Sequence, residues 1–299
     1  MSKITLCNED CLNTMQRIAK YSPNSVDMVL TSPPYNITRQ VVGRGGVRDR
    51  GYDVYVDQRT PSDYIEWCCE IFKMFNRLLV PNGVVLWNVS YGSDSSQGIE
   101  CSSTVWTCLA EIIKQTDFMV ADKIAWKKSS AYLNNISPNK LTRIVEDIFV
   151  FCRKDEYKTY YRNNEISSIR DNGQVMYKPI FNFVEAKNND GACNLNKATF
   201  STELCRWLLG VYAKPNAVVY DPFMGTGTTS VACCQLGLNC IGSEISEKQV
   251  RYSLNRLGVL DKDIVQESDG IYSFSDVHCN LCRQHRMDSV VSDSLFDIV

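Results

Sequence analysis

The stretch VVYDPFMGTGTTSVACCQLG, residues 218–237, decides the fold of this chain. A short apolar strand ends at Asp221, Pro222 and Gly225-Thr226-Gly227 predict a tight turn, and a helix begins near Thr228. Glycines let the backbone approach a ligand, and a helix start offers free N–H groups to a carboxylate or phosphate. A P-loop would need a Lys after the last Gly, which is missing here. The stretch therefore predicts a ligand site between a strand and a helix.

A second strand ends in an acidic residue, at Cys240-Ile241-Gly242-Ser243-Glu244. Glu244 follows the glycine-rich turn by about 20 residues, the spacing at which an acid accepts hydrogen bonds from ribose hydroxyls in nucleoside-binding folds. Alone, Glu244 would be a residue beside a helix N-cap. Together with the turn it favours a nucleoside-type cofactor.

Short apolar runs alternate with longer helical patterns along the chain. This alternation predicts an α/β fold of Rossmann type, an open, mostly parallel sheet with helices on both faces. Ligands of such sheets bind beyond the carboxyl ends of the strands. We expect strands at 26–31, 83–89, 119–126, 145–152, 217–221 and 238–242, and helices at 61–80, 100–115, 201–213, 227–236 and 246–257.

A proline-rich bend, LTSPPYN at residues 30–36, follows the first of these strands. Two successive prolines cannot donate to a sheet ladder, so they stop the strand abruptly. An ordinary proline turn explains the bend but not the hydroxyl of Ser32 before it or the ring of Tyr35 after it. A further functional site is expected here.

Two stretches break the alternation. Residues 37–59 are rich in Gly and Arg, and residues 157–199 are polar with scattered basic and aromatic side chains. Loops of this length inside a compact domain are usually functional or disordered.

The composition, 44% hydrophobic with a mean hydropathy of −0.22, is typical of a soluble globular protein. The chain has no run of about 20 apolar residues and no signal-peptide core, so we expect an intracellular protein without a membrane partner. The 14 cysteines are scattered, which favours reduced core residues over a disulfide framework.

The charge is distributed unevenly. The whole chain has a net charge of −2, but residues 261–299 carry eight acidic residues against Lys262, Arg283 and Arg286. Residues 120–162 instead have nine Lys and Arg against five Asp and Glu. A basic surface beside an acidic tail is compatible with a nucleic-acid partner, although solvated faces often have the same composition.

These motifs resemble those of the β class of DNA amino-methyltransferases. DPFMGTGTT and GSEIS are similar to the S-adenosylmethionine site of that family, TSPPYN to its catalytic motif, and the catalytic motif comes first, as in the permuted β class. Asn8-Glu9-Asp10-Cys11 resembles the family's NGDC, with Glu9 where Gly is usual, and Trp126-Lys127 resembles a W-x-K stretch that precedes an acid, here Glu146. The resemblance covers most of residues 4–258.

The resemblance implies a class I methyltransferase with a mostly parallel, seven-stranded twisted sheet, and a reaction without a metal or a covalent intermediate. Glu244 would bind the ribose, Asp10 the adenine amino group, and Thr228 with its helix start the carboxylate of S-adenosyl-L-methionine. The implied cofactor-binding residues are Asp10, Cys11, Thr31, Asp221, Phe223, Gly225, Gly227, Thr228 and Glu244.

The reaction explains the composition of the proline-rich bend. An exocyclic amine is a poor nucleophile because its lone pair is conjugated into the ring, so it must be held in line with the methyl group. Ser32 Oγ and the Pro33 carbonyl can accept hydrogen bonds from the amine, Pro33 and Pro34 fix their direction, and Tyr35 can stack on a base flipped out of double-stranded DNA. These four residues are the expected catalytic residues.

The product remains open between two amines. Cytosine C5 chemistry needs a Cys nucleophile, usually after a Pro, and no Pro here precedes Cys. Ser before the two prolines favours N4-cytosine over the alternative, N6-adenine, for which Asp is more frequent in the family. A catalytically inactive DNA-binding scaffold or partner subunit, and more weakly an RNA methyltransferase, are further alternatives.

We expect a methyltransferase domain over 1–260, with DNA contacts in a mobile loop at 37–59 and target recognition in the 157–199 insert. The expected DNA-binding residues are Arg39, Arg44, Arg48, Arg50, Lys127 and Lys128. A homodimer is a further expectation.

Residues 261–299 are expected to be an acidic linker or tail. His278, Cys279, Cys282 and His285 are residue types that bind zinc, but four ligands within eight residues would strain a tetrahedral site, so no metal is expected. The final apolar run weakly resembles the first strand of a chromodomain. That resemblance would imply the catalytic part of a longer eukaryotic enzyme that acts on chromatin in the nucleus; otherwise the cytoplasm is expected.

Overall fold

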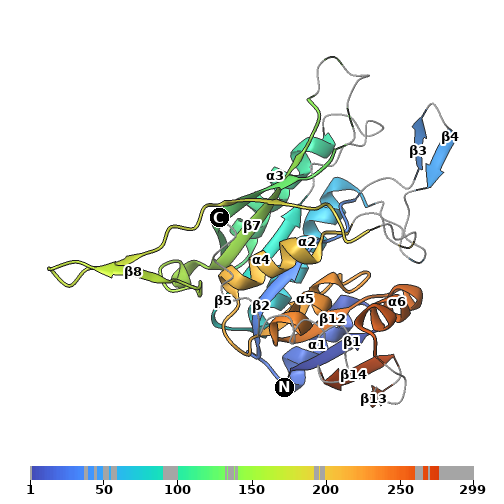
Figure 1. The fold of residues 1–299 in the computed structure, drawn as a ribbon. Coiled ribbons are helices and arrows are strands. Elements are labelled where there is room, and N and C mark those ends of the chain that lie inside the picture. The colour runs from blue at the N-terminus through green and yellow to red at the C-terminus, as the bar shows by residue number, and fades with distance from the viewer. Residues whose placement is uncertain are drawn as a thin grey trace.

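The computed structural model describes residues 2–36, 40–43, 46–49, 54, 59–89, 100–131, 133, 138, 141–191, 195, 199–259, 265–268 and 270–275. Within them, one sheet of ten strands has the order β10-β6-β7-β5-β2-β11-β12-β1-β14-β13 (Figure 1). Its strands are β1 (Lys3–Cys7), β2 (Val26–Thr31), β5 (Leu79–Val89), β6 (Phe118–Lys128), β7 (Val145–Arg153), β10 (Phe183–Ala186), β11 (Val218–Asp221), β12 (Asn239–Ser243), β13 (Val265–Ser268) and β14 (Ile271–Ser275).

The centre of the sheet is parallel and its margins are mixed. Strands β5, β2, β11, β12 and β1 pair in parallel, whereas β7 is antiparallel to both of its neighbours, β5 and β6. The expected seven strands are therefore too few. Strand β10 extends the sheet beyond β6, and the antiparallel pair β14 and β13 extends it beyond β1.

Helices cover both faces of the sheet, as the alternation predicted. Along β2, Val29 packs in the core beneath the first three helices, whereas Met28 and Leu30 pack in the core beneath the last three. This period of two is the pleat of a strand that is buried on both faces. The helices are α1 (Cys11–Tyr21), α2 (Pro61–Leu78) and α3 (Glu100–Gln115) on one face, and α4 (Thr202–Tyr212), α5 (Thr228–Leu236) and α6 (Glu247–Leu257) on the other.

Local signals in the sequence explain where the helices begin and end. Thr60 Oγ1 accepts a hydrogen bond from the Asp63 amide and Pro61 occupies the first turn of α2, as predicted. Helices α5 and α6 end at Gly237 and Gly258, which have φ of 69° and 67°, a left-handed conformation that suits glycine.

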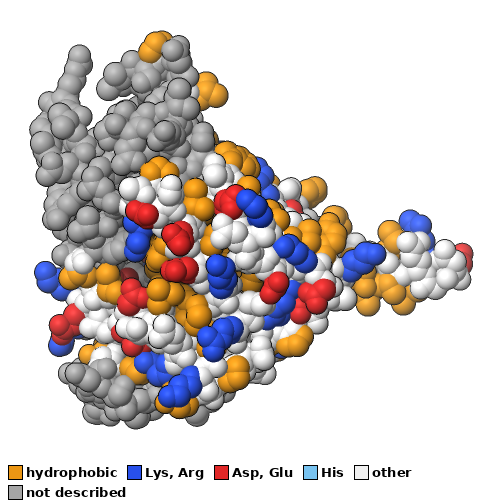
Figure 2. Space-filling view, turned by 180° about the vertical axis from the view of Figure 1, so that it is seen from behind, with side chains coloured by type: hydrophobic (Ala, Val, Ile, Leu, Met, Phe, Trp, Pro, Cys, Tyr) orange, Lys and Arg blue, Asp and Glu red, His pale blue; other side chains and the backbone are white. Residues whose placement is uncertain are grey.

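The 157–199 insert divides into two parts. Strands β8 (Ile166–Ile169) and β9 (Val175–Tyr177) form a hairpin, called the arm here, which projects from the body (Figures 1 and 2). The chain enters the arm at Tyr161, whose amide donates to the Asn82 carbonyl near the start of β5. Strand β10 then runs parallel to β6, so the carboxyl ends of these two strands lie at the same end of the sheet.

The 37–59 region also contains a hairpin, although its sequence has no period. Strands β3 (Gln40–Gly43) and β4 (Gly46–Asp49) pair with each other in a separate two-stranded sheet. The side chain of Asn36 joins the two ends of the region, because it donates to the Arg59 carbonyl and accepts from the Arg59 amide.

Residues 265–275 correct the expectation of a tail that begins at 261. Strand β14 pairs with β1 along its whole length, and Phe274 and Ile271 are 4% and 8% exposed. The strand is only five residues long and lies in an acidic sequence, so its pairing with the far end of the chain has no local signal. Residues 276–299, including the His and Cys cluster, lie outside the described residues.

Within the described part of the chain, no helix is long and apolar enough to cross a membrane. Nine cysteines are buried free thiols, as expected for core residues, whereas Cys234 is disulfide-bonded.

Candidate active site

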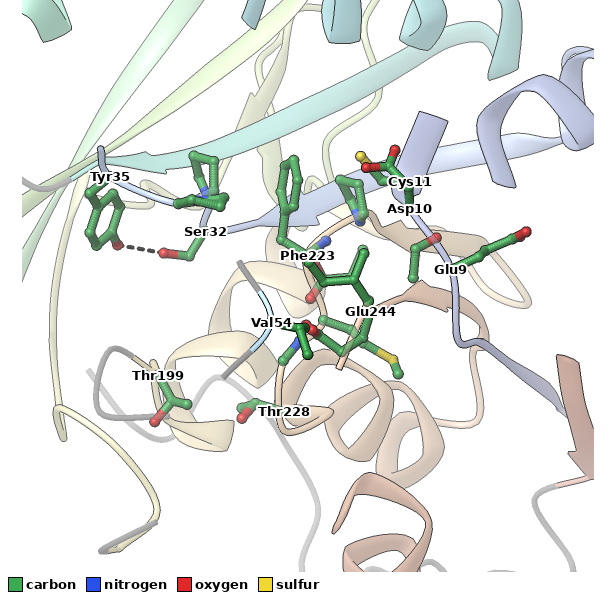
Figure 3. A pocket seen from close by; sticks show the side chains of 18 of the residues that line it. Glu9, Asp10, Cys11, Ser32, Tyr35, Val54, Thr199, Phe223, Thr228 and Glu244 are labelled. Carbon is green, nitrogen blue, oxygen red and sulfur yellow. Dashed lines mark hydrogen bonds between the residues drawn. The ribbon is translucent and has the colours of Figure 1, made fainter. Parts of the chain in front are cut away.

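An open pocket of about 930 Å³ lies beyond the carboxyl ends of the adjacent strands β2, β11, β12 and β1. This volume includes open solvent in front of the pocket. Most of the predicted site residues line it, although they come from both halves of the chain (Figure 3). They are Asp10, Cys11, Ser32, Pro33, Pro34, Tyr35, Asp221, Phe223, Gly225, Thr228 and Glu244.

Two predicted cofactor residues, Thr31 and Gly227, do not line the pocket. Thr31 is fully buried, and its hydroxyl donates to Asp221 Oδ1 at 2.7 Å. Gly227 has φ of 77°, and a Cβ at this position would lie 2.8 Å from the Cβ of Ser253 in α6. Both residues therefore shape the turn from behind, and Gly227 lets α6 pack against it.

Asp221 is the buried centre of the glycine-rich turn. Its carboxylate accepts from Thr31 Oγ1 at 2.7 Å, Thr229 Oγ1 at 2.6 Å and the Phe223 amide at 3.1 Å. Burial raises the pKa of Asp221 to about 6, although these hydrogen bonds act in the opposite direction. The residue joins β2, β11 and α5 beneath the pocket.

The raised pKa makes stability depend on pH. An Asp in an unfolded chain has a pKa of about 3.9, so the folded state binds more protons between about pH 4 and 6, and the free energy of unfolding falls as pH rises through this window. Asp221→Asn removes the titration. We expect the stability of wild type relative to Asp221→Asn to decrease by about 2–3 kcal/mol between pH 4 and pH 7, measured by urea denaturation.

The exposed Asp171 in the tip of the arm gives the matched control for this pH dependence. The stability of wild type relative to Asp171→Asn should stay constant over the same range. A difference between wild type and Asp221→Asn that does not change with pH would show that the carboxyl of Asp221 titrates normally.

Glu244 closes the other side of the turn. Its Oε2 accepts from the Gly225 amide at 3.0 Å, and its Oε1 accepts from the Ser246 amide at 2.9 Å. Both bonds fix the carboxylate at the pocket wall, where it can accept hydrogen bonds from the hydroxyls of a ribose. Figure 3 places Glu244 between the glycine-rich turn and the Asp10 region.

The Asn8–Cys11 region forms a further wall of the pocket. Asp10 is the N-cap of α1, because its Oδ1 accepts from the Leu12 amide at 2.8 Å. Glu9, which replaces the Gly usual in the resembled family, also lines the pocket; its Oε1 accepts from Thr14 and lies 2.6 Å from Arg17 Nη2. These contacts hold the Glu9 carboxylate against α1, so the family's Gly is replaced without an unpaired charge.

Ser32 and Tyr35 contact each other at the catalytic end of the pocket, where their hydroxyls form a hydrogen bond (Figure 3). The carbonyl of Pro34 accepts from Tyr64 of α2 at 2.9 Å. The prolines and these contacts fix the bend between β2 and the 37–59 region. The arrangement presents a hydroxyl, a rigid Pro33 carbonyl and an aromatic ring to the same hollow.

A buried polar network behind this bend was not predicted as a unit. Asn88, 2% exposed at the end of β5, donates from Nδ2 to Tyr35 at 2.8 Å, Ser32 at 3.4 Å and Glu146 Oε2 at 3.1 Å. Glu146 in turn pairs with Lys128. Because a carboxylate can only accept, Glu146 orients the Asn88 amide so that its NH₂ group faces the catalytic hydroxyls. Only the strand order β2-β5-β7 brings these residues together.

Arg59 and Trp67 also line the pocket without having been predicted. The Arg59 guanidinium lies 5.1 Å from the centre of the Trp67 ring, and Trp67 packs against Phe223 at 5.4 Å. Val54, from the same 37–59 region as Arg59, contributes to the lining as well. Val54 and Arg59, which follow the catalytic motif in the chain, therefore form part of the pocket wall.

The predicted DNA-binding residues are only partly described. Lys127 pairs with Glu185 at 2.8 Å, and Lys128 with Glu146, both near the carboxyl end of β6. Arg39, Arg44 and Arg50 lie outside the described residues, and so does the side chain of Arg48.

The sheet order and this pocket are like those of the class I methyltransferase fold, and the residues present fit S-adenosylmethionine. A fixed carboxylate, Glu244, faces the pocket on one side, the N-terminus of α5 lies on the other, and Phe223 with Trp67 supplies apolar surface between them. The chain belongs to the DNA methylase family, whose pattern matches residues 26–255. It is accordingly a DNA methyltransferase that uses S-adenosylmethionine.

Relatives and solved structures agree with this assignment. The type II methyltransferase M.Cfr9I of Citrobacter freundii is 25% identical over 289 residues, 88% of this chain and 90% of that protein. The type II methyltransferase M.BglII of Bacillus subtilis is 24% identical over 80% of this chain and 65% of that protein. The structure of PvuII DNA methyltransferase (cytosine-N4-specific) has a TM-score of 0.64 at 18% identity and covers 89% of this chain and 90% of that one. The M1.HpyAVI–SAM complex has a TM-score of 0.55 at 21% identity over 86% of this chain and all of that one.

Proposed function

We propose that this enzyme methylates the exocyclic N4 amine of cytosine in DNA. The observation that carries the proposal is the hydroxyl of Ser32, which stands beside the Pro33 carbonyl at the catalytic end of the pocket. A hydroxyl polarises an amine less strongly than a carboxylate, and N4-cytosine enzymes of this family more often have Ser at this position. The likeness to the cytosine-N4-specific PvuII enzyme also supports this proposal.

The residues of the chain act on the amine and on the base. Ser32 Oγ and the Pro33 carbonyl accept hydrogen bonds from the amine and hold its lone pair towards the cofactor side of the pocket. Tyr35 stacks on the flipped base and excludes water from it. S-Adenosylmethionine supplies the electrophilic methyl group. The cofactor, held by Glu244 and the start of α5, would give its methyl group to the nitrogen lone pair, with the electrons of the S–C bond left on sulfur, and the nitrogen would release one proton to solvent.

The DNA contacts of the 157–199 insert belong to its second part rather than to the arm. The arm begins beside Asn82, six residues before Asn88 on β5, so it leaves the body about 20 Å from the catalytic end of that strand. Thr199, in contrast, lines the pocket, and Asn188 contacts Ser130 near the end of β6. We infer that target recognition uses residues 187–199 together with the 37–59 region.

Mass spectrometry of nucleosides tests the proposed product. Unmethylated duplex DNA treated with the enzyme and S-adenosylmethionine should yield N4-methyldeoxycytidine and no N6-methyldeoxyadenosine. The reverse result would overturn the assignment to cytosine. If neither nucleoside forms on several DNA sequences, while the protein binds S-adenosylhomocysteine and DNA, the chain is a scaffold or partner subunit.

A further inference from the structure

A half-buried arginine lies behind the glycine-rich turn, outside the pocket lining. Arg256, in the last turn of α6, donates from Nη1 to Thr228 Oγ1 at 2.8 Å and to the Thr226 carbonyl at 3.3 Å. Its side chain is 18% exposed, and burial lowers its pKa. Thr228 itself lines the pocket at the first position of α5. Thr228 therefore lies between the Arg256 guanidinium and the pocket.

The counter-ion of Arg256 comes from the end of the 157–199 insert. Asp190 pairs with Arg256 Nη2, and its carboxylate also accepts from the Thr202 hydroxyl and, at 2.7 Å, from the Thr202 amide at the start of α4. The pair thus connects α6, α4 and the insert beside Thr199. The side chains of Arg256 and Asp190 are 18% and 32% exposed, and an ion pair that is partly open to water adds little stability, so a role for its charge and direction has to be considered.

The direction of the bond to Thr228 has a chemical consequence. A guanidinium can only donate, so Thr228 Oγ1 acts as the acceptor in this contact and its own proton is directed elsewhere. The pocket lies on the other side of this hydroxyl, next to the N–H groups at the start of α5. Such a helix start, together with a hydroxyl donor and a positive charge behind it, is suited to a carboxylate.

We propose that Arg256 is a positioning residue for the carboxylate of S-adenosylmethionine. It fixes the Thr228 hydroxyl as a donor towards that group and supplies a positive charge behind it, without contacting the cofactor. Asp190 holds the guanidinium in place and links this part of the cofactor site to residues 187–199. The proposal rests on the cofactor and does not depend on which base is methylated.

A cofactor analogue that lacks the carboxylate shows how much of the binding free energy depends on that group. S-Adenosylhomocysteine and S-adenosyl-3-thiopropylamine differ only in this group, and calorimetry gives the affinity of the intact protein for each. Arg256→Met should weaken the binding of S-adenosylhomocysteine about tenfold, the size expected for the loss of one charge-assisted hydrogen bond. It should change the affinity for the amine analogue less than about twofold. Equal losses for both ligands would show a merely structural role, and no loss for either would also overturn the proposal.

Matched variants complete the test. Arg251 lies on the same helix in an exposed pair with Glu247, and Arg251→Met should leave both affinities unchanged. Thr228→Val should reproduce the selective loss, and adding Arg256→Met to it should cause a smaller loss than Arg256→Met causes alone. If Arg256→Met is unstable, Arg256→Met/Asp190→Asn removes the uncompensated charge, and the same ligand comparison then decides. A selective loss without Thr228 dependence would assign the effect to charge alone and refute the orientation of the hydroxyl.

Discussion

Ser32→Ala is expected to lower the turnover number for DNA methylation by about 100- to 1,000-fold, the usual effect of removing one hydrogen-bonding group aimed at the reacting atoms. The loss corresponds to about 3–4 kcal/mol of transition-state stabilisation. Without Oγ the amine keeps the Pro33 carbonyl as an acceptor but is no longer held from two sides. The rate of methyl transfer from labelled S-adenosylmethionine to duplex DNA, under single-turnover conditions, measures the effect.

The cofactor site should be unaffected by this substitution. Asn88 still donates to the Tyr35 hydroxyl at 2.8 Å, and Tyr64 still holds the Pro34 carbonyl, so the bend keeps its shape. S-Adenosylhomocysteine should bind Ser32→Ala within about twofold of wild type. Ser25, which immediately precedes β2 and whose hydroxyl donates to the Ser22 carbonyl, supplies the control Ser25→Ala, which should retain full activity. Methylation by Ser32→Ala near the wild-type rate would remove Ser32 from the catalytic group.

The sequence predicts the centre of the fold well because its signals there are local. Residues 218–228 combine a strand, glycines in a tight turn and a helix start within one short stretch, and the structure confirms each of them. The prolines and glycines that mark strand ends also locate the pocket, since parallel strands meet it with their carboxyl ends. The margins of the sheet are different. Strand β14 is defined by pairing with β1, about 270 residues earlier in the chain, and no local pattern marks that contact.

The same distinction applies to the site. Asp10, Ser32 and Glu244 adjoin recognisable motifs, and all three line the pocket. Asn88 and Arg256 belong to no motif that we identified, because their roles depend on which strands and helices become neighbours. Thr31 and Gly227 lie inside motifs but face away from the pocket. A residue within a motif can therefore be expected to shape the glycine-rich turn or the proline-rich bend, but it need not line the pocket.

Two truncations should separate the C-terminal strands from the residues that follow them. A chain that ends at 259 loses β13 and β14, which uncovers the edge of β1 and removes the buried side chains of Ile271 and Phe274. Burial of two such side chains contributes about 3–6 kcal/mol, a large part of the stability of an ordinary domain. We expect this chain to be unfolded or strongly destabilised. A chain that ends at 275 should fold and methylate naked DNA like the full chain.

The point variant Phe274→Ala keeps this prediction measurable if the shorter chain cannot be purified. It should lower the free energy of unfolding by about 3–5 kcal/mol, whereas Tyr272→Phe on the same strand should change it by less than about 1 kcal/mol. Because the Asn8 amide donates to the Gly270 carbonyl at 2.7 Å, loss of β14 also loosens the wall that carries Asp10, and cofactor affinity should fall together with stability. Full stability and activity of the chain ending at 259 would show that β1 needs no partner on that side and that the sheet of the enzyme ends there.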